Sequence, residues 1–257
     1  MAQTATVWRE LDASDIATIV PVAVKVMYHD FMSYSVQRQQ LQQAVKPMLR
    51  GVSHAATAPL ALAATIVLAV VAGGDPAKQL TVVIYGGTMV LLFSGSALYH
   101  IGNWSERTRE VLRRLDHSNI FLLIAGTYTP IAFTLLQGRQ RIGILGAVWG
   151  LSLCGVAFSV SGIKLPRLVF TSLYLMVGWV AVLALPTIFG RVGLGGALLL
   201  ALGGGLYSIG AVCYALKRPV LWRRVFSYHE VFHLFVIAAA AAFLTFIVVY
   251  ILPLPAA

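Results

Sequence analysis

Residues 231–251 read VFHLFVIAAAAAFLTFIVVYI and contain no Asp, Glu, Lys or Arg. A helix needs about 20 predominantly apolar residues to cross the hydrocarbon core of a bilayer, and this stretch meets that requirement. Water would not tolerate so long an uncharged run as protein surface. We therefore expect residues 231–251 to form a transmembrane helix.

Six other stretches of the chain meet the same requirement. In chain order they are residues 55–73, 80–101, 117–137, 142–163, 168–190 and 192–216. The last two are separated by little more than Arg191, so a tight re-entrant turn is an alternative to two full crossings there. Of the 257 residues, 59% are hydrophobic and only 11% are charged, whereas soluble domains carry roughly 25% charged residues. The sequence thus predicts an all-α integral membrane protein, a bundle of seven transmembrane helices.

Positive charges are unequally divided between the two ends of this expected bundle. Of the 19 Lys and Arg residues, all but Lys78, Arg139, Arg141 and Arg191 lie in the N-terminal arm or after the second, fourth and sixth spans. Cytoplasmic segments of membrane proteins carry the excess of Lys and Arg. We therefore expect a retained cytosolic N-terminal arm over residues 1–54, and a transmembrane domain over residues 55–257 whose C-terminus is outside.

Several function classes fit this pattern poorly. A G-protein-coupled receptor has its N-terminus outside, which would place the basic residues on the wrong face. A retinal pump needs a Schiff-base lysine in its seventh span, yet no Lys follows Lys217. The net charge of +10 does not indicate a nucleic-acid partner, because the basic residues lie in short gaps between apolar runs. Transport stays open but lacks support, since no internal repeat is visible.

Ionisable side chains gather at the end of the expected bundle that faces the cytosol. From residue 111 onward the only acidic residues are Asp116 and Glu230, and each stands beside a histidine at the start of an apolar span. His100 ends the second span, while His229 and His233 open the seventh. Ionisable groups inside a membrane are expensive to bury and are therefore candidates for function.

The histidine spacing points to a metal ion. His229 and His233 are four residues apart, so on a helix both imidazoles lie on one face. The segment that joins them reads HEVFH, which satisfies the H-E-x-x-H pattern of zinc proteases. We predict that His100, His229 and His233 bind one metal ion, with Asp116 as an acceptor that orients a ligating histidine or water. Ser96 precedes His100 by the same four-residue spacing and is, with Asp116, a candidate catalytic residue.

Plainer interpretations of these residues stay open. Asp116 can neutralise Arg113 or Arg114, or cap a helix. Ser96 can be a polar contact between helices. Glu230 points about 100° away from its histidine neighbour on a helix, so its role is undecided. A position at the membrane interface is the interpretation we prefer for the other histidines, which are His29, His54 and His117.

A glycine pair raises the question of self-association. Gly146 and Gly150 form a G-x-x-x-G pattern in the fourth span. Small residues at this spacing let two helices approach closely in a membrane. Close packing within the bundle is the interpretation we prefer, and a seam between two copies of the chain is the alternative. A homo-oligomer is therefore a possible arrangement.

Five segments of the chain carry a recognisable pattern. They are KPMLRGVSH at 46–54, SALYH at 96–100, LDHSNI at 115–120, AGTYTP at 125–130 and HEVFH at 229–233. In this order they resemble the haemolysin III branch of the progestin and adipoQ receptor family, and the match covers roughly residues 46–252.

The resemblance implies a seven-helix bundle with a cytosolic N-terminus, in agreement with the charge distribution. It also implies Zn²⁺ bound by His100, His229 and His233, with Asp116 and Ser96 near the water that completes the site. Wider relatives include alkaline ceramidases, so the resemblance implies metal-dependent hydrolysis of lipid amides or esters, with membrane lipids as partners. The basic composition fits a bacterial inner membrane.

Three other functions fit the same residues. One is a receptor or lipid sensor in which the zinc is structural. Another is a pore-forming or lytic protein, in line with the link between the bacterial branch and haemolysis. The third is an intramembrane zinc protease built on His229, Glu230 and His233, which would need a further ligand such as His100 or Asp116.

Overall fold

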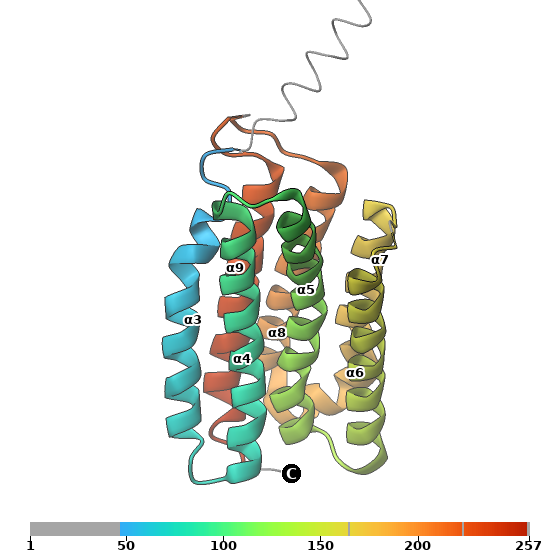
Figure 1. Ribbon diagram of the computed structural model, residues 1–257. Coiled ribbons are helices and arrows are strands. Elements are labelled where there is room, and N and C mark those ends of the chain that lie inside the picture. Colours follow the sequence, from blue (N-terminus) through green and yellow to red (C-terminus); the bar gives the residue numbers. More distant parts are fainter. Residues whose placement is uncertain (1–46, 164, 223, 256–257) are drawn as a thin grey trace, which may run out of the picture. The chain divides into compact units, whose positions relative to one another are not determined.

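Runs of Leu, Ile, Val and Ala fold into long helices in the computed structural model, which describes residues 47–163, 165–222 and 224–255. Most of the expected N-terminal arm, including His29, lies outside these residues. In chain order the elements are α3 (Val52–Val71), α4 (Pro76–Ile101), α5 (Glu106–Leu135), α6 (Gly138–Ser161), α7 (Arg167–Gly178), the 3₁₀-helix η1 (Trp179–Ala184), α8 (Leu185–Leu216), α9 (Tyr228–Phe246) and the π-helix η2 (Ile247–Ile251). Figure 1 shows the long helices side by side as one bundle.

Length and composition identify this bundle as a membrane protein. Within the described residues, six helical stretches are long and apolar enough to cross a bilayer. Large apolar side chains such as Leu60, Val70 and Leu183 are exposed on the bundle's outer surface. Such a surface suits lipid tails, while the backbone polar groups are satisfied inside each helix. The chain is therefore an all-α, multi-pass membrane protein.

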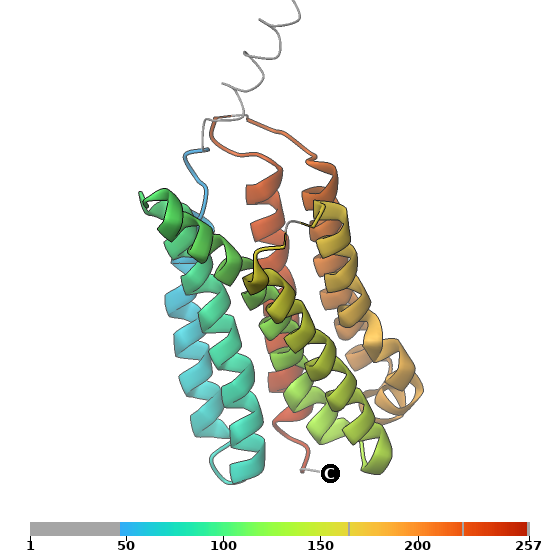
Figure 2. The same ribbon diagram turned by 45° about the vertical axis from the view of Figure 1, so that its right-hand side comes forward.

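The predicted fifth and sixth spans fall within one helical stretch, Arg167–Leu216, which is 50 residues long. This stretch is interrupted at Gly193, whose φ of 63° and ψ of −167° are not helical, so two helices meet there at a kink. Pro186 lies in the first turn of α8, directly after η1. Helices α7 and α8 contact each other, and Figure 2 shows them next to one another.

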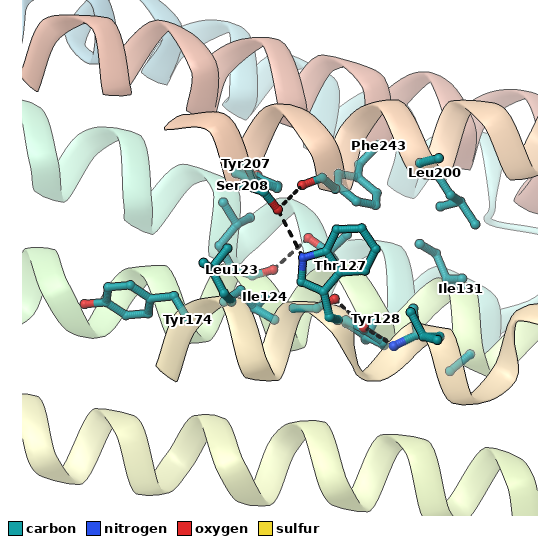
Figure 3. A pocket seen from close by; sticks show the side chains of 18 of the residues that line it. Leu123, Ile124, Thr127, Tyr128, Ile131, Tyr174, Leu200, Tyr207, Ser208 and Phe243 are labelled. Atoms are coloured by element: carbon teal, nitrogen blue, oxygen red, sulfur yellow. Dashed lines mark hydrogen bonds between the residues drawn. The ribbon is translucent and has the colours of Figure 1, made fainter. Parts of the chain in front are cut away.

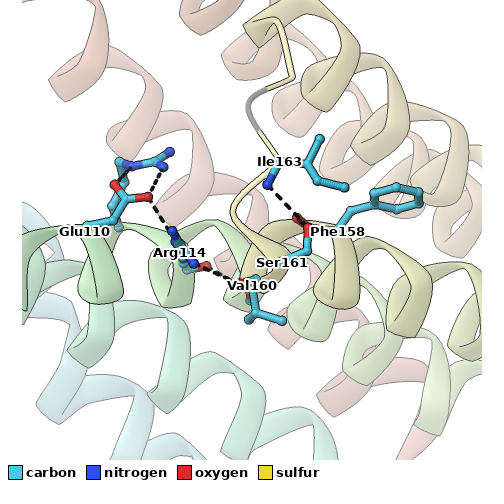
Figure 4. A network of polar contacts seen from close by, with 8 residues as sticks. Glu110, Arg114, Phe158, Val160, Ser161 and Ile163 are labelled. Atoms are coloured by element: carbon cyan, nitrogen blue, oxygen red, sulfur yellow. Dashed lines mark hydrogen bonds and ion pairs between the residues drawn. The ribbon is translucent and has the colours of Figure 1, made fainter. Parts of the chain in front are cut away.

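Helix α5 begins well before the apolar span expected from residue 117. Ser105 caps it by accepting a hydrogen bond from the Thr108 N–H. Glu110 then accepts hydrogen bonds from Arg113 and Arg114, one turn further along. The Arg114 guanidinium also donates to the carbonyl of Val160 near the end of α6, at 3.0 Å (Figure 4). Basic residues in the gap between two apolar runs thus extend the helix, and Arg114 ties α5 to α6.

Glycines decide where neighbouring helices approach most closely. A Cβ built on Gly155 of α6 would overlap the buried ring of Phe121 on α5, so this position requires glycine. A Cβ on Gly146 or Gly150 would meet nothing within 4 Å. The expectation that Gly146 and Gly150 pack closely within the bundle is therefore wrong, because both face away from the neighbouring helices.

Candidate metal site

Three histidines from two helices converge at one end of the bundle. His100 lies in the last turn of α4, while His229 and His233 lie in the first turns of α9. One potential ligand atom from each lies within 4.8 Å of the other two. The Nε2 atoms of His100 and His229 are 3.0 Å apart. The structure thus brings together the three residues that the sequence predicted to share a metal ion.

The donor set and its surroundings fit a divalent metal. The ring centroid of His229 lies 4.6 Å from the ring centroid of His100 and 4.6 Å from that of His233. His100 and His233 are buried and His229 is half-buried. Two imidazole nitrogens on one tetrahedral zinc ion lie about 3.3 Å apart, given bond lengths of roughly 2.0–2.1 Å. Small rotations of these side chains would therefore suffice to bind a metal ion.

Asp116 and Ser96 lie beside this cluster. The Asp116 Oδ2 atom is 3.7 Å from Nε2 of His100, and its side chain is 15% exposed. The buried Ser96 hydroxyl donates a hydrogen bond to the Asp116 carboxylate. The Asp116 carboxylate is thus nearest to the His100 nitrogen that also faces His229. It therefore lies on the side of the His100 ring that faces the other candidate ligands. That position suits a group that contacts water or substrate between the histidines.

Glu230 has a structural role, and not the catalytic role that glutamate has in the H-E-x-x-H pattern of zinc proteases. Its carboxylate is 2% exposed, and Oε1 accepts a hydrogen bond from Arg50 Nε at 2.9 Å. The other oxygen, Oε2, accepts from the backbone N–H of Ser227 at 2.7 Å, in a capping box that begins α9. Both oxygens are therefore engaged in holding the helix start. This engagement leaves the protease interpretation without its general base.

His54 is the residue that the sequence interpretation missed. We expected it to be an ordinary interfacial side chain, but it is buried inside the bundle and only 2% exposed. Its ring stacks on His233 with centroids 3.8 Å apart and planes inclined by 10°. One feature of the sequence could have indicated His54. It lies at the start of an apolar span, and so at the same expected depth as the three candidate ligands. His117 is half-buried, contacts Phe170 and stands outside the cluster.

An apolar cavity of about 230 Å³ lies between α5, α7, α8 and α9, lined also by parts of α4 and α6. Its wall includes Phe232 and Val236 of α9, which flank His233 in sequence. Figure 3 shows Tyr207, Ser208 and Tyr128 among the few polar side chains in this wall. The hydroxyl of Tyr207 is buried and has no hydrogen-bond partner in the described part of the chain. The cavity thus offers space for an apolar chain, and Phe232 in its wall has its ring centroid 6.2 Å from that of His229.

Comparison with known proteins identifies the family. Residues 42–244 match the model of a family described as Haemolysin-III related. The chain belongs to this family. It is 34% identical over 172 residues to the Hemolysin-3 homolog of Bacillus subtilis (strain 168), covering 67% of this chain and 78% of that protein. It is 32% identical over 218 residues to Hemolysin-3 of Bacillus cereus, covering 83% and 96% of the two chains. The predicted resemblance is confirmed.

Proposed function

We propose that this protein is a zinc-dependent hydrolase of lipid amide or ester bonds that acts at the cytosolic end of the bundle. The observation that carries the proposal is the meeting of His100, His229 and His233, with ligand atoms within 4.8 Å of one another. Imidazole-rich sites of this kind favour zinc among the common divalent metals.

Each residue of the site has a distinct task in this proposal. His100, His229 and His233 would hold the metal, which when bound supplies Lewis acidity that polarises a carbonyl and acidifies water. Asp116 would orient the attacking water, accept its proton and pass that proton to the leaving group. Ser96 would fix the rotamer of Asp116 through their hydrogen bond.

The cavity supports a lipid as the substrate. Its wall is almost entirely aliphatic and aromatic. One wall residue, Phe232, contacts His229, with ring centroids 6.2 Å apart. An acyl chain that enters from the bilayer is already out of water, so dispersion contacts with the cavity wall would hold it there. A lipid drawn from the surrounding membrane could thus place its polar linkage at the site while its chain occupies the cavity.

The topology that we propose has seven crossings with the N-terminus in the cytosol, in a bacterial inner membrane. The Arg167–Leu216 stretch supports two crossings, since its 50 residues would extend about 75 Å as one straight helix, against a hydrocarbon core of about 30 Å. The break at Gly193 provides the turn between the two. An odd number of crossings then places the C-terminus outside.

A hydrolysis assay tests the proposed activity. Protein reconstituted in liposomes would be given ceramides and phospholipids, and the release of fatty acid would be measured. We expect release that a zinc chelator abolishes and added zinc restores, and that is absent from the His229→Ala, His233→Ala double variant. Zinc-loaded protein that releases no fatty acid from any of these lipids would contradict the proposal and favour a sensor with a structural metal.

A lytic function is the second candidate, favoured by the printed names of both relatives, Hemolysin-3 homolog and Hemolysin-3. A pore would conduct ions through reconstituted bilayers whether or not the histidines are present. Conductance that survives replacement of His100, His229 and His233 would support it. Hydrolysis lost in the same variant would instead support the metal-dependent function.

A further inference from the structure

His54 comes from outside the predicted ligand set, yet it makes the closest ring contact in the cluster. It lies in the first turn of α3, while its partner His233 lies on α9, far along the chain. The two imidazoles are nearly parallel, with centroids 3.8 Å apart. The rings of His54 and the buried Phe93 also make an edge-to-face contact, with centroids 5.1 Å apart.

We propose that His54 is a positioning residue, which fixes the plane of the His233 imidazole so that His233 can bind the metal. This inference rests on the metal-binding part of the proposed function and does not depend on the identity of the substrate. His54 is absent from the group of three potential ligands. Because the two stacked rings lie in nearly parallel planes, the ring nitrogens of His54 and His233 lie in separate planes.

His233 needs such a partner because one side of its ring lacks a hydrogen bond. Ligating histidines usually donate their other N–H to a carboxylate or a carbonyl, which sets the ring orientation. In the described part of the chain, Nδ1 of His233 is buried without a hydrogen-bond partner. Rotation about the Cβ–Cγ bond is therefore limited by packing. Among the rings that contact His233, His54 is the one that stacks parallel to it, so its face sets the plane of the ring.

Contacts made by residues 48–51 hold the start of α3, where His54 lies. The backbone N–H groups of Met48 and Leu49, just before α3, donate to carbonyls just before α9. Arg50 pairs with the buried Glu230 on α9. Gly51 starts α3 with a φ of 86°, and a Cβ there would approach Cβ of His100 to 2.6 Å. The first turn of α3 is thus fixed against both helices that carry the candidate ligands.

Metal binding gives a direct test that does not require activity. Cobalt would be used because zinc has no visible spectrum, and its affinity would be measured by competition with a coloured chelator. His54→Leu keeps apolar volume without a ring, whereas His54→Phe keeps a stacking ring without nitrogens. We expect His54→Leu to weaken binding by about 10–100-fold, the usual effect of losing an outer contact to a ligand, and to alter the cobalt absorption band. His54→Phe should stay within roughly threefold of the wild type, as the stack is retained.

His117→Ala is the matched control, since this histidine lies at a similar depth but does not contact the cluster. It should bind cobalt like the wild type. Folded His54→Leu protein with unchanged affinity and spectrum would overturn the inference and leave the proposed function intact. Equal losses in His54→Leu and His54→Phe would also overturn it, because the ring nitrogens would then matter instead of the stack. Wild-type protein that binds neither cobalt nor zinc would overturn the proposed function, and this inference with it.

Discussion

Asp116 and Glu230 look alike in the sequence, since each is an acid beside a histidine at the start of an apolar span. Their surroundings differ. Glu230 has one oxygen on Arg50 and the other on the backbone of Ser227. Asp116 is held by Ser96 and lies 3.7 Å from a nitrogen of His100. One carboxylate therefore has a structural role, and the other remains available to the site.

Replacing Asp116 with Asn should separate chemistry from metal binding. The amide keeps the shape of the side chain but cannot accept a proton, and general acid–base groups typically contribute about 10²–10⁴-fold to a rate. We expect Asp116→Asn protein to keep its metal and to lose about that factor in lipid hydrolysis. Ser96→Ala should lose less, since it only frees the rotamer of Asp116. A normal rate in Asp116→Asn would remove this residue from the mechanism.

Replacing Glu230 with Gln should affect stability first. The change leaves the Arg50 guanidinium without its charged partner, at a cost of about 2 kcal/mol for a partly buried pair. We expect a lower midpoint of thermal unfolding in detergent and hydrolysis that persists below it. Glu110→Gln is the control, because its exposed pairs with Arg113 and Arg114 should cost under about 1 kcal/mol. An inactive Glu230→Gln protein of unchanged stability would revive the protease interpretation.

Sequence reasoning located the three candidate ligands because helical spacing and depth in the membrane are both readable from a sequence. It missed His54 because a lone histidine at a helix start looks like an interfacial residue. The contact that distinguishes His54 is a stack between α3 and α9, and no local pattern reports which rings meet across a bundle. The role of Glu230 was undecided for the same reason, whereas Asp116 was predicted as an acceptor at the site.

At the scale of the helices, two glycines of α6 offer a direct test of packing. Gly155 faces the Phe121 ring with no room for a Cβ, while Gly150 faces open space. Gly155→Ala should destabilise the protein by about 1–3 kcal/mol through overpacking. Gly150→Ala should be neutral or stabilising by up to about 1 kcal/mol, because alanine is the better helix former. Unfolding midpoints in one detergent compare the two, and an equal loss in both would contradict this packing.

The apolar runs predicted the membrane helices well, but not their ends. Helix α5 starts at Glu106 because Ser105 caps it and Glu110 pairs with Arg113 and Arg114. Hydropathy does not detect this polar first part of the helix. The boundary near Arg191 was equally hard to place, since apolar residues continue on both sides and only the backbone of Gly193 marks the break.

For the molecule as a whole, the orientation in the membrane is testable by cysteine labelling. Met48 is exposed just before α3, and Gly74 is exposed just after it, at the opposite end of one crossing. In spheroplasts, and with both native cysteines replaced by Ala, a membrane-impermeant maleimide should label Gly74→Cys. It should label Met48→Cys only after the membrane is opened. The reverse pattern would place the histidine cluster outside and contradict the charge distribution.

The central claim is that His100, His229 and His233 together hold one metal ion. The most direct measurement is the metal content of detergent-purified protein by mass spectrometry, with the His229→Ala, His233→Ala double variant alongside. His117→Ala serves as the control for a histidine outside the cluster. The account predicts one zinc per chain in the wild type and in the control, and none in the double variant. Wild-type protein without stoichiometric metal, even when zinc is supplied throughout purification, would contradict it.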